Sequence, residues 1–296
     1  MSDDPLTAID TAPAPPEGAP GKRTPGRAGR DLPAAIGVGA GLGGLVLATL
    51  WSPWRWGFVV VVIAAVVLGV HEVVQALRRI GARPPKVPLV VGGAAMVALA
   101  YVSGADALVL ALALTVLACL AWRLADPSEG FLRDVAASAF TATYVPFLAG
   151  FAALLALPDD GPRRVTAFIL LVVCSDTGGY VAGVLFGKHP MAPTVSPKKS
   201  WEGFGGSLVA AGVGGAVVFP TMLDAAPVLG AVFGVAVVCT ATLGDLGESM
   251  LKRDIGIKDM GTLLPGHGGV MDRLDSLLPT APVAYVLLGA FVQSSG

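Results

Sequence analysis

Charged residues are scarce in this sequence. They make up 14% of the 296 residues, whereas hydrophobic residues make up 54%, and a soluble domain has about 25% charged residues. So few charges cannot cover the surface of a soluble protein of this length, which excludes the cytosolic and secreted globular classes. The formal net charge is only −1, so the composition also argues against a nucleic acid as a partner. It predicts an integral membrane protein.

Cysteine and histidine are also rare, with three of each. Cys119, Cys174 and Cys239 all lie within apolar runs and form no CxxC pair. Free cysteines in such runs are small buried hydrophobic residues. Their spacing predicts neither disulfide bonds nor a zinc site.

The first 31 residues lack large apolar side chains after Ile9 and are rich in Pro, Gly and Ala. Such a segment cannot bury enough surface to offset the entropy lost on ordering. We therefore expect residues 1–31 to be a disordered cytoplasmic tail. No apolar core follows its start, so it does not resemble a cleaved signal peptide.

Long apolar windows fill the remainder of the chain. A membrane-spanning helix needs about 20 apolar residues, and nine such windows lie near 33–51, 56–77, 87–103, 105–122, 134–157, 164–187, 204–221, 226–243 and 277–293. Only residues 103–106 separate the third window from the fourth, so eight spans remain an alternative. The predicted fold class is an all-α polytopic membrane protein. We divide it into N-terminal helices over 32–160 and a C-terminal catalytic part over 161–296.

The basic residues predict the orientation of these spans. With nine spans and the tail in the cytoplasm, 17 of the 20 Lys and Arg fall on the inner side, and only Arg55, Arg163 and Arg164 fall on the outer side. Inner loops of membrane proteins are enriched in Lys and Arg. We therefore expect a cytoplasmic N-terminus, and the two longest polar segments, 188–203 and 244–276, on the cytoplasmic face.

The segment 244–276, which we expect to be a loop, is unusually acidic. Six of the chain's 21 acids lie in it: Asp245, Glu248, Asp254, Asp259, Asp272 and Asp275. Acids beside a bilayer are costly unless they are paired or used. Carboxylate oxygens are ligands that Mg²⁺ prefers, and the loop has no cysteine and little histidine, so magnesium is favoured over zinc.

Basic residues accompany these acids. They are Lys252, Arg253, Lys258 and Arg273 in the same segment, and Lys198 and Lys199 in 188–203. Acids for a metal and cations for anions together indicate phosphoryl or nucleotidyl transfer. The positive-inside pattern alone would also place basic residues here, and no Walker or dinucleotide glycine motif is present.

Two acids lie inside apolar windows and away from the first residues of those windows. Asp176 is near the middle of its window, where an ionisable residue costs about 2.5–3.5 kcal/mol on insertion scales, so we predict a functional role over a structural ion pair. Glu72, next to His71, is closer to the inner end of its window. An interfacial hydrogen-bonded pair explains these two residues at least as well as a function.

The charged positions form a recognisable pattern. Ser249-x-x-Lys252-Arg253-x4-Lys258-Asp259-x5-Pro265-x-His267-Gly-Gly-x-x-Asp272-Arg273-x-Asp275 resembles the signature of the phosphatidate cytidylyltransferase, or CDP-diacylglycerol synthase, family. The blocks that begin at Ser175, Phe186 and Ser196 are similar to the family's other motifs and follow in the same order. The similarity is strong over 165–290.

This resemblance implies transfer of CMP from CTP to phosphatidic acid at the cell (plasma or inner) membrane, with one or two Mg²⁺ ions, by a homodimer. A CTP-dependent lipid kinase and a transporter remain alternatives. On this basis we assign metal binding to Asp245 and Asp272, with Asp176, Asp259 and Asp275 as further candidates. Catalytic contacts are expected from Asp245, Asp272, Lys252, Arg253 and His267. Substrate contacts are expected from Asp176, Ser196, Lys198, Lys199, Ser249, Lys258 and Arg273.

Overall fold

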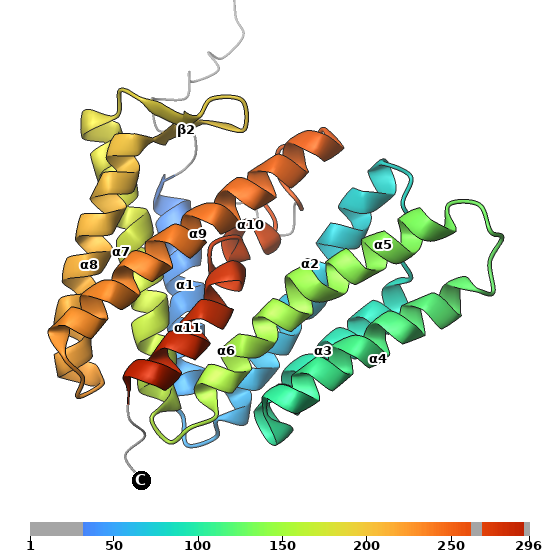
Figure 1. Cartoon of the computed structure of the whole chain (residues 1–296), viewed down its shortest axis with the longest axis horizontal. Helices are drawn as coiled ribbons and strands as arrows, with labels where there is room; N and C mark the ends of the chain where they lie inside the picture. Colours follow the sequence, from blue (N-terminus) through green and yellow to red (C-terminus); the bar gives the residue numbers. More distant parts are fainter. Residues whose placement is uncertain (1–31, 262–267, 293–296) are drawn as a thin grey trace, which may run out of the picture.

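The computed structural model describes residues 32–261 and 268–292. The expected tail over 1–31 and the candidate His267 lie outside the described residues. Helices dominate the part of the chain that is described (Figure 1). In chain order the elements are α1 Leu32–Leu50, α2 Trp56–Arg79, α3 Lys86–Ser103, α4 Ala105–Arg123, α5 Phe131–Ala142, η1 Thr143–Phe147, α6 Leu148–Ala156, α7 Gly161–Phe186, β1 Pro190–Ala192, β2 Ser196–Ser200, α8 Trp201–Met222, α9 Pro227–Ile255, α10 Met271–Leu274 and α11 Leu277–Phe291.

The helices match the apolar windows. Eight segments of the described chain are long and apolar enough to cross a membrane, and these are the last eight of the nine predicted windows. The first window is the helix α1, within which Gly39–Leu50 is a shorter apolar stretch. The prediction of an all-α polytopic fold is therefore confirmed, and the count of nine spans stays a prediction.

Helix α11 lies between two groups of helices. Helices α2 to α6 pack together on one side of it, and α7, α8 and α9 pack together on the other (Figure 1). Each side has its own apolar core. Leu89, Met96 and Leu108 are fully buried in the first, and Phe219 and Phe233 in the second. One kink has a clear cause: Pro146 cannot donate to the helix ladder, and the helix widens into the π-turn η1 around it.

Small residues bring α7 and α8 into backbone contact. A Cβ atom on Gly178 would collide with Ala210 and with the backbone of Gly206, and one on Gly179 would collide with the hydroxyl of Ser207. Small residues allow such close approach of membrane helices. The two helices consequently form a tight pair with short side chains along their seam, and this seam becomes the floor of the cavity described below.

Helix α9 is longer than its apolar window. The expected loop over 244–276 is wrong for its first part, because the helix continues to Ile255 and ends at Gly256, whose φ of +76° suits glycine. A helix of 29 residues is about 44 Å long, at 1.5 Å per residue, and exceeds a bilayer core of about 30 Å. The polar end of α9 therefore continues the same helix as its apolar part.

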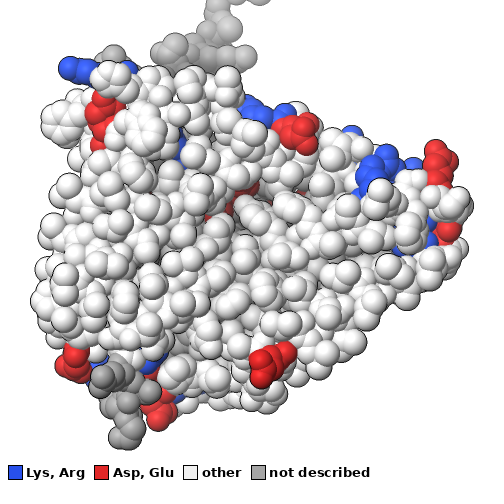
Figure 2. All heavy atoms as spheres, viewed as in Figure 1, with Lys and Arg blue, Asp and Glu red and all other residues white. Residues whose placement is uncertain are grey.

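Charged side chains gather at opposite edges of the molecule. Figure 2 shows a wide band between these edges that carries few Lys, Arg, Asp or Glu side chains, as expected for a membrane-spanning surface. The three arginines predicted to be on the outer side have acidic partners. Arg55 lies 3.9 Å from Asp159, and Arg164 lies 2.8 Å from Asp160; Arg163 pairs with Asp224.

Candidate active site

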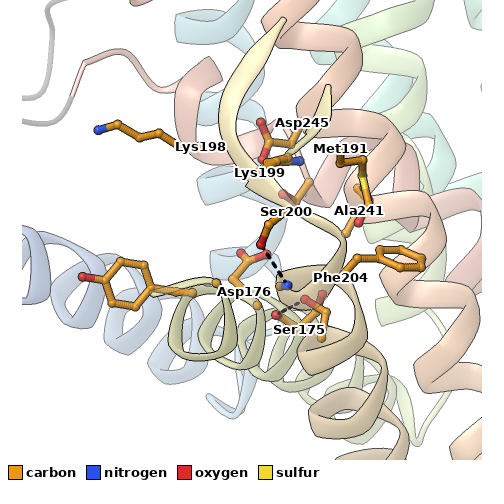
Figure 3. Close-up of a pocket in the computed structure, with 16 residues that line it drawn as sticks. Ser175, Asp176, Met191, Lys198, Lys199, Ser200, Phe204, Ala241 and Asp245 are labelled. Atoms are coloured by element: carbon orange, nitrogen blue, oxygen red, sulfur yellow. Dashed lines mark hydrogen bonds and ion pairs between the residues drawn. The ribbon is translucent and has the colours of Figure 1, made fainter. Parts of the chain in front are cut away.

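A cavity of about 310 Å³ lies between α7, α8, α9 and the β1–β2 hairpin. This volume is near the lower end of the range for small-molecule sites. Its walls come from segments far apart in the sequence, and Figure 3 shows several of the side chains. The lining residues are Ser175, Asp176, Gly179, Tyr180, Gly183, Met191, Lys198, Lys199, Ser200, Gly203, Phe204, Ser207, Ala241, Thr242, Asp245 and Ser276.

The cavity contains a close ion pair. Lys199 Nζ lies 2.6 Å from Asp245 Oδ2, and both side chains are partly exposed, at 24% and 35%. Lys199 comes from β2 and Asp245 from α9, so the pair joins the hairpin to the long helix. Lys198 also lines the cavity, but its chain extends away from Asp245 (Figure 3), as the alternation of side chains along a strand requires.

The hairpin was not predicted from the sequence. It is fixed at its base by Glu202, whose carboxylate accepts from the backbone N–H groups of Lys188 and His189 at 3.2 Å and lies 2.6 Å from His189 Nδ1. Ser200 caps α8, with its hydroxyl accepting from the N–H of Gly203 at 3.1 Å. These contacts hold β2, and with it Lys199, over the cavity.

Asp176 is on the cavity wall, as its position in an apolar window suggested. It lies on α7 and is exposed to the cavity. Its carboxylate interacts electrostatically with those of Asp245 and Asp275 and with the Lys199 ammonium. Three predicted metal-binding candidates from α7, α9 and the segment before α11 are thus brought into one neighbourhood.

A second polar cluster follows along the same face of α9. Lys252 lies two helical turns beyond Asp245, and its Nζ is 2.9 Å from Asp272 Oδ1 and 3.2 Å from Glu248 Oε1. Asp272 Oδ2 also accepts from the N–H groups of Met260 at 3.1 Å and Gly269 at 2.7 Å. Asp272 therefore ties α9 to the segments on both sides of 262–267.

Asp259 belongs to this second cluster. A Cβ atom on Gly268 would lie 2.7 Å from Asp272 Oδ2 and 3.3 Å from Asp259 Oδ1, so the two carboxylates approach the same point of the backbone. Gly268 has a φ of +79°, which favours glycine. A side chain at this position would strain the backbone and crowd both acids.

The other predicted site residues lie around these two clusters. Ser249 donates to Asp245 Oδ1 at 3.4 Å. Arg253 donates to the carbonyl of Val195 in the hairpin turn at 3.4 Å. Ser196 begins β2 outside the cavity lining. Lys258 and Arg273 are exposed.

The carboxylates do not form a ready-made metal cage. Among the described residues, no group of three or more His, Cys, Asp or Glu side chains is arranged to hold a metal ion. Asp245 and Asp272 instead contact Lys199 and Lys252. The cavity lining nevertheless offers the carboxylates of Asp176 and Asp245 and no histidine or cysteine. This hard-oxygen donor set suits Mg²⁺, which usually takes one or two carboxylates together with substrate phosphates and water.

Three residues of this region have buried side-chain oxygens whose contacts were not predicted from the sequence. Glu248 is fully buried, and the ion pair of its Oε1 with Lys252 Nζ at 3.2 Å is the contact its carboxylate makes in the described chain, with no further hydrogen bond to either oxygen. The hydroxyl of Tyr144, in η1, is also buried and has no hydrogen-bond partner among the described residues. Glu72, in α2, accepts two backbone hydrogen bonds from residues 270 and 271. The spacing of Glu248 and Lys252 at i and i+4 was the one visible signal.

Comparison with known proteins agrees with this arrangement. The sequence profile of the Cytidylyltransferase family matches residues 34–291, which include all the helices that surround the cavity. This chain belongs to the Cytidylyltransferase family.

Named relatives cover nearly the whole chain. It is 46% identical over 284 residues to the phosphatidate cytidylyltransferase of Mycobacterium leprae, an alignment that covers 90% of each protein. It is 47% identical over 277 residues to that of Mycobacterium tuberculosis H37Rv, covering 88% of this chain and 84% of the relative. The enzyme of Haemophilus influenzae is 41% identical over 150 residues, about half of each chain. The resemblance stated from the sequence is confirmed.

Proposed function

We propose that this protein transfers CMP from CTP to phosphatidic acid, giving CDP-diacylglycerol and pyrophosphate. Relatives named phosphatidate cytidylyltransferase match it over almost their full length, which supports this activity. The observation that carries the proposal is the cavity at the seam of α7, α8 and α9, where lysines of β2 and carboxylates of α7 and α9 converge. Phosphoryl and nucleotidyl transfer need this combination, since most of the catalysis is positioning and neutralisation of charge.

The reaction requires no protein nucleophile. A phosphate oxygen of the lipid forms a bond to the α-phosphorus of CTP, and the bond from that phosphorus to the pyrophosphate oxygen breaks. The lipid phosphate is largely ionised near neutrality, since the second pKa of a phosphomonoester is about 6. A general base is therefore unnecessary, and the main obstacle is repulsion between two polyanions.

The chain's own cations reduce this repulsion. Lys199 and Lys198 line the cavity and would hold phosphate oxygens there. Lys252 lies further along α9, and Arg253 contacts the hairpin turn; these two would hold the second substrate or the leaving pyrophosphate. The same proposal includes five further substrate contacts: Ser196, Ser249, Lys258, His267 and Arg273.

Magnesium belongs to the proposal as the cofactor. Asp245 and Asp272 would hold it, with Asp176, Asp259 and Asp275 as further ligands or partners of the ligands. When bound, Mg²⁺ supplies positive charge that polarises the transferring phosphate and stabilises the leaving pyrophosphate. Asp245 is the better exposed of the two main candidates, at 35% against 8% for Asp272.

The placement in the cell is also a proposal. The excess of basic residues in alternate connections supports a cytoplasmic N-terminus and a cavity that opens to the cytoplasm, where CTP is available. The apolar helices and the lipid substrate support a multi-pass protein of the cell membrane. We further propose a homodimer, in line with the family resemblance.

Release of pyrophosphate tests the activity. Purified protein with CTP, magnesium and phosphatidic acid should release pyrophosphate and form CDP-diacylglycerol, which mass spectrometry identifies. The matched control lipid is diacylglycerol, which lacks the phosphate nucleophile and should give no product. A CTP-dependent kinase would transfer the γ-phosphoryl group of CTP to diacylglycerol, giving phosphatidic acid and CDP. No reaction with either lipid would contradict both activities.

A further inference from the structure

The segment that carries Asp272 is attached to a helix of the N-terminal group. Glu72 of α2 accepts from the backbone N–H of Val270 through Oε1 at 3.0 Å and from that of Met271 through Oε2 at 2.9 Å. About two hundred residues separate the partners in sequence. Both oxygens of one carboxylate are thus used to hold two consecutive peptide groups.

The surrounding backbone is shaped to this carboxylate. A Cβ atom on either Gly261 or Gly269 would collide with the Glu72 carboxylate, so the chain passes directly over it from two sides. One turn earlier on α2, a Cβ atom on Gly69 would lie 3.1 Å from Met271 Sδ. Met271 is fully buried. Glu72 and Gly69 together form the surface of α2 against which residues 269–271 pack.

This contact does more than fill space. Glu72 is 3% exposed, and a buried carboxylate is costly unless donors satisfy it. Here the N–H groups of Val270 and Met271 satisfy it, and an apolar side chain in its place would leave both N–H groups without this acceptor. The charge-assisted bonds to two N–H groups are directional and strong, and such bonds fix the position of a backbone.

The residue after Met271 is Asp272, which contacts Lys252 Nζ at 2.9 Å. We propose that Glu72 is a positioning residue for the transfer reaction: it holds residues 270–272 so that Asp272 meets Lys252 on α9. Glu72 lines no part of the cavity and acts through the backbone of the segment. This inference rests on the proposed function and adds a contribution of the N-terminal helices to the site.

The test compares Glu72→Gln, Glu72→Ala and the control Gln75→Ala in the full-length protein. Gln75 lies on the same helix and is exposed. Glu72→Gln keeps the volume and one acceptor oxygen but loses the charge. We expect its kcat to fall by about ten- to a hundredfold, as for other residues that orient site groups, while the KM for CTP changes less than about threefold. Glu72→Ala should be slower still, and Gln75→Ala should match the wild type.

Hydrogen exchange gives a readout independent of the reaction. Exchange in Glu72→Gln should be faster in the segment 268–274 and unchanged in 245–255 of α9. Faster exchange in both segments would mean that Glu72 only stabilises the fold, and unchanged exchange or a wild-type kcat would also overturn the proposal. Should Glu72→Ala fail to fold, Glu72→Gln alone decides. Should the wild type make no CDP-diacylglycerol, the proposed function fails, and exchange still decides whether Glu72 holds this segment.

Discussion

Two polar clusters in predicted inner connections differ in what their carboxylates face. Beside the connection between α4 and α5, Asp134 in the first turn of α5 is 1% exposed and accepts from Arg123 Nε at 2.9 Å and from the N–H of Arg83 at 2.7 Å. Arg123 in turn donates to the carbonyls of Pro127 and Glu129. In the other cluster, Asp245 is 35% exposed on a cavity wall and pairs with Lys199 of the β1–β2 hairpin, which is 24% exposed.

The difference shows why a group of charged residues beside a surface depression is not enough to identify a binding site. The residues around Asp134 also line a depression, of about 280 Å³. There the guanidinium of Arg123 is engaged by a carboxylate and by backbone carbonyls, so its donors are already used. At the cavity of α7, α8 and α9 the carboxylates and ammonium groups come from separate elements and remain accessible. The first cluster fixes a turn, and the second can bind a ligand.

The largest expected effect is on turnover at Asp245 and Asp272, the two main candidates for the metal site. Asp245→Asn and Asp272→Asn should each lower kcat by roughly a hundredfold or more, because an amide keeps the volume but loses the charge that a magnesium ion requires. Rates per mole of folded protein, measured at saturating magnesium, check this. Asp159→Asn is the control, an exposed acid at the opposite end. A near-normal rate for either variant would remove that residue from the metal site.

The next effect is on stability, at the cluster of Asp134 and Arg123. Asp134→Asn should lower the free energy of unfolding by roughly 3–5 kcal/mol, because it leaves the buried Arg123 without its carboxylate. The folded fraction should keep a kcat close to that of the wild type. Thermal unfolding in detergent, with activity measured below the transition, separates the two quantities. A stable but inactive Asp134→Asn protein would show that this cluster takes part in the reaction.

A smaller effect should separate the two lysines of β2. Loss of a hydrogen bond to a charged group costs about 1.5–3 kcal/mol, so Lys199→Ala should raise the KM for CTP by about ten- to a hundredfold. Lys198 points away from Asp245 (Figure 3), and Lys198→Ala should raise that KM less. Steady-state kinetics over a range of CTP concentrations measure both. No effect of either substitution would favour placement of these lysines by topology alone, and equal rises in KM would contradict the distinction between them.

The smallest perturbation tests orientation without altering the site. In a protein whose exposed Cys239 is replaced by serine, a cysteine at Ser128 should react with an impermeant thiol reagent only from the cytoplasmic side of sealed vesicles. One at Asp159 should react only from the other side. The expectation follows from the partition of the basic residues. Labelling of position 159 from the cytoplasmic side, or of position 128 from the outer side, would contradict the nine-span topology.

The spans could be predicted because the bilayer imposes one rule on all of them. Each window of about 20 apolar residues became a helix. The same rule misplaced the end of α9, since hydropathy falls at Gly244 although the helix continues. Glu248 and Lys252 at i and i+4 support that continuation.

The sequence predicted which residues belong to the site, but not which of them would contact one another. Asp176 was identified by the cost of an acid within an apolar window, and Lys199 and Asp245 by the charged residues and motifs of the two polar segments. All three line the cavity. That Lys199 would face Asp245 depends on the register of a short hairpin, which no long pattern specifies. The sequence offered a hydrogen-bonded pair with His71 as one explanation of Glu72, but Glu72 instead contacts residues 270 and 271. This contact was missed because its partners are backbone N–H groups about two hundred residues away, which leave no signal in the sequence.

The fate of labelled phosphates tests the central claim most directly. Protein, magnesium and phosphatidic acid are incubated with CTP labelled at the α- or at the γ-phosphate, and the lipid fraction is counted. We expect the α-label to enter the lipid, the γ-label to leave as pyrophosphate, and EDTA and Asp245→Asn each to abolish the transfer. Entry of the γ-label into the lipid would contradict the claim.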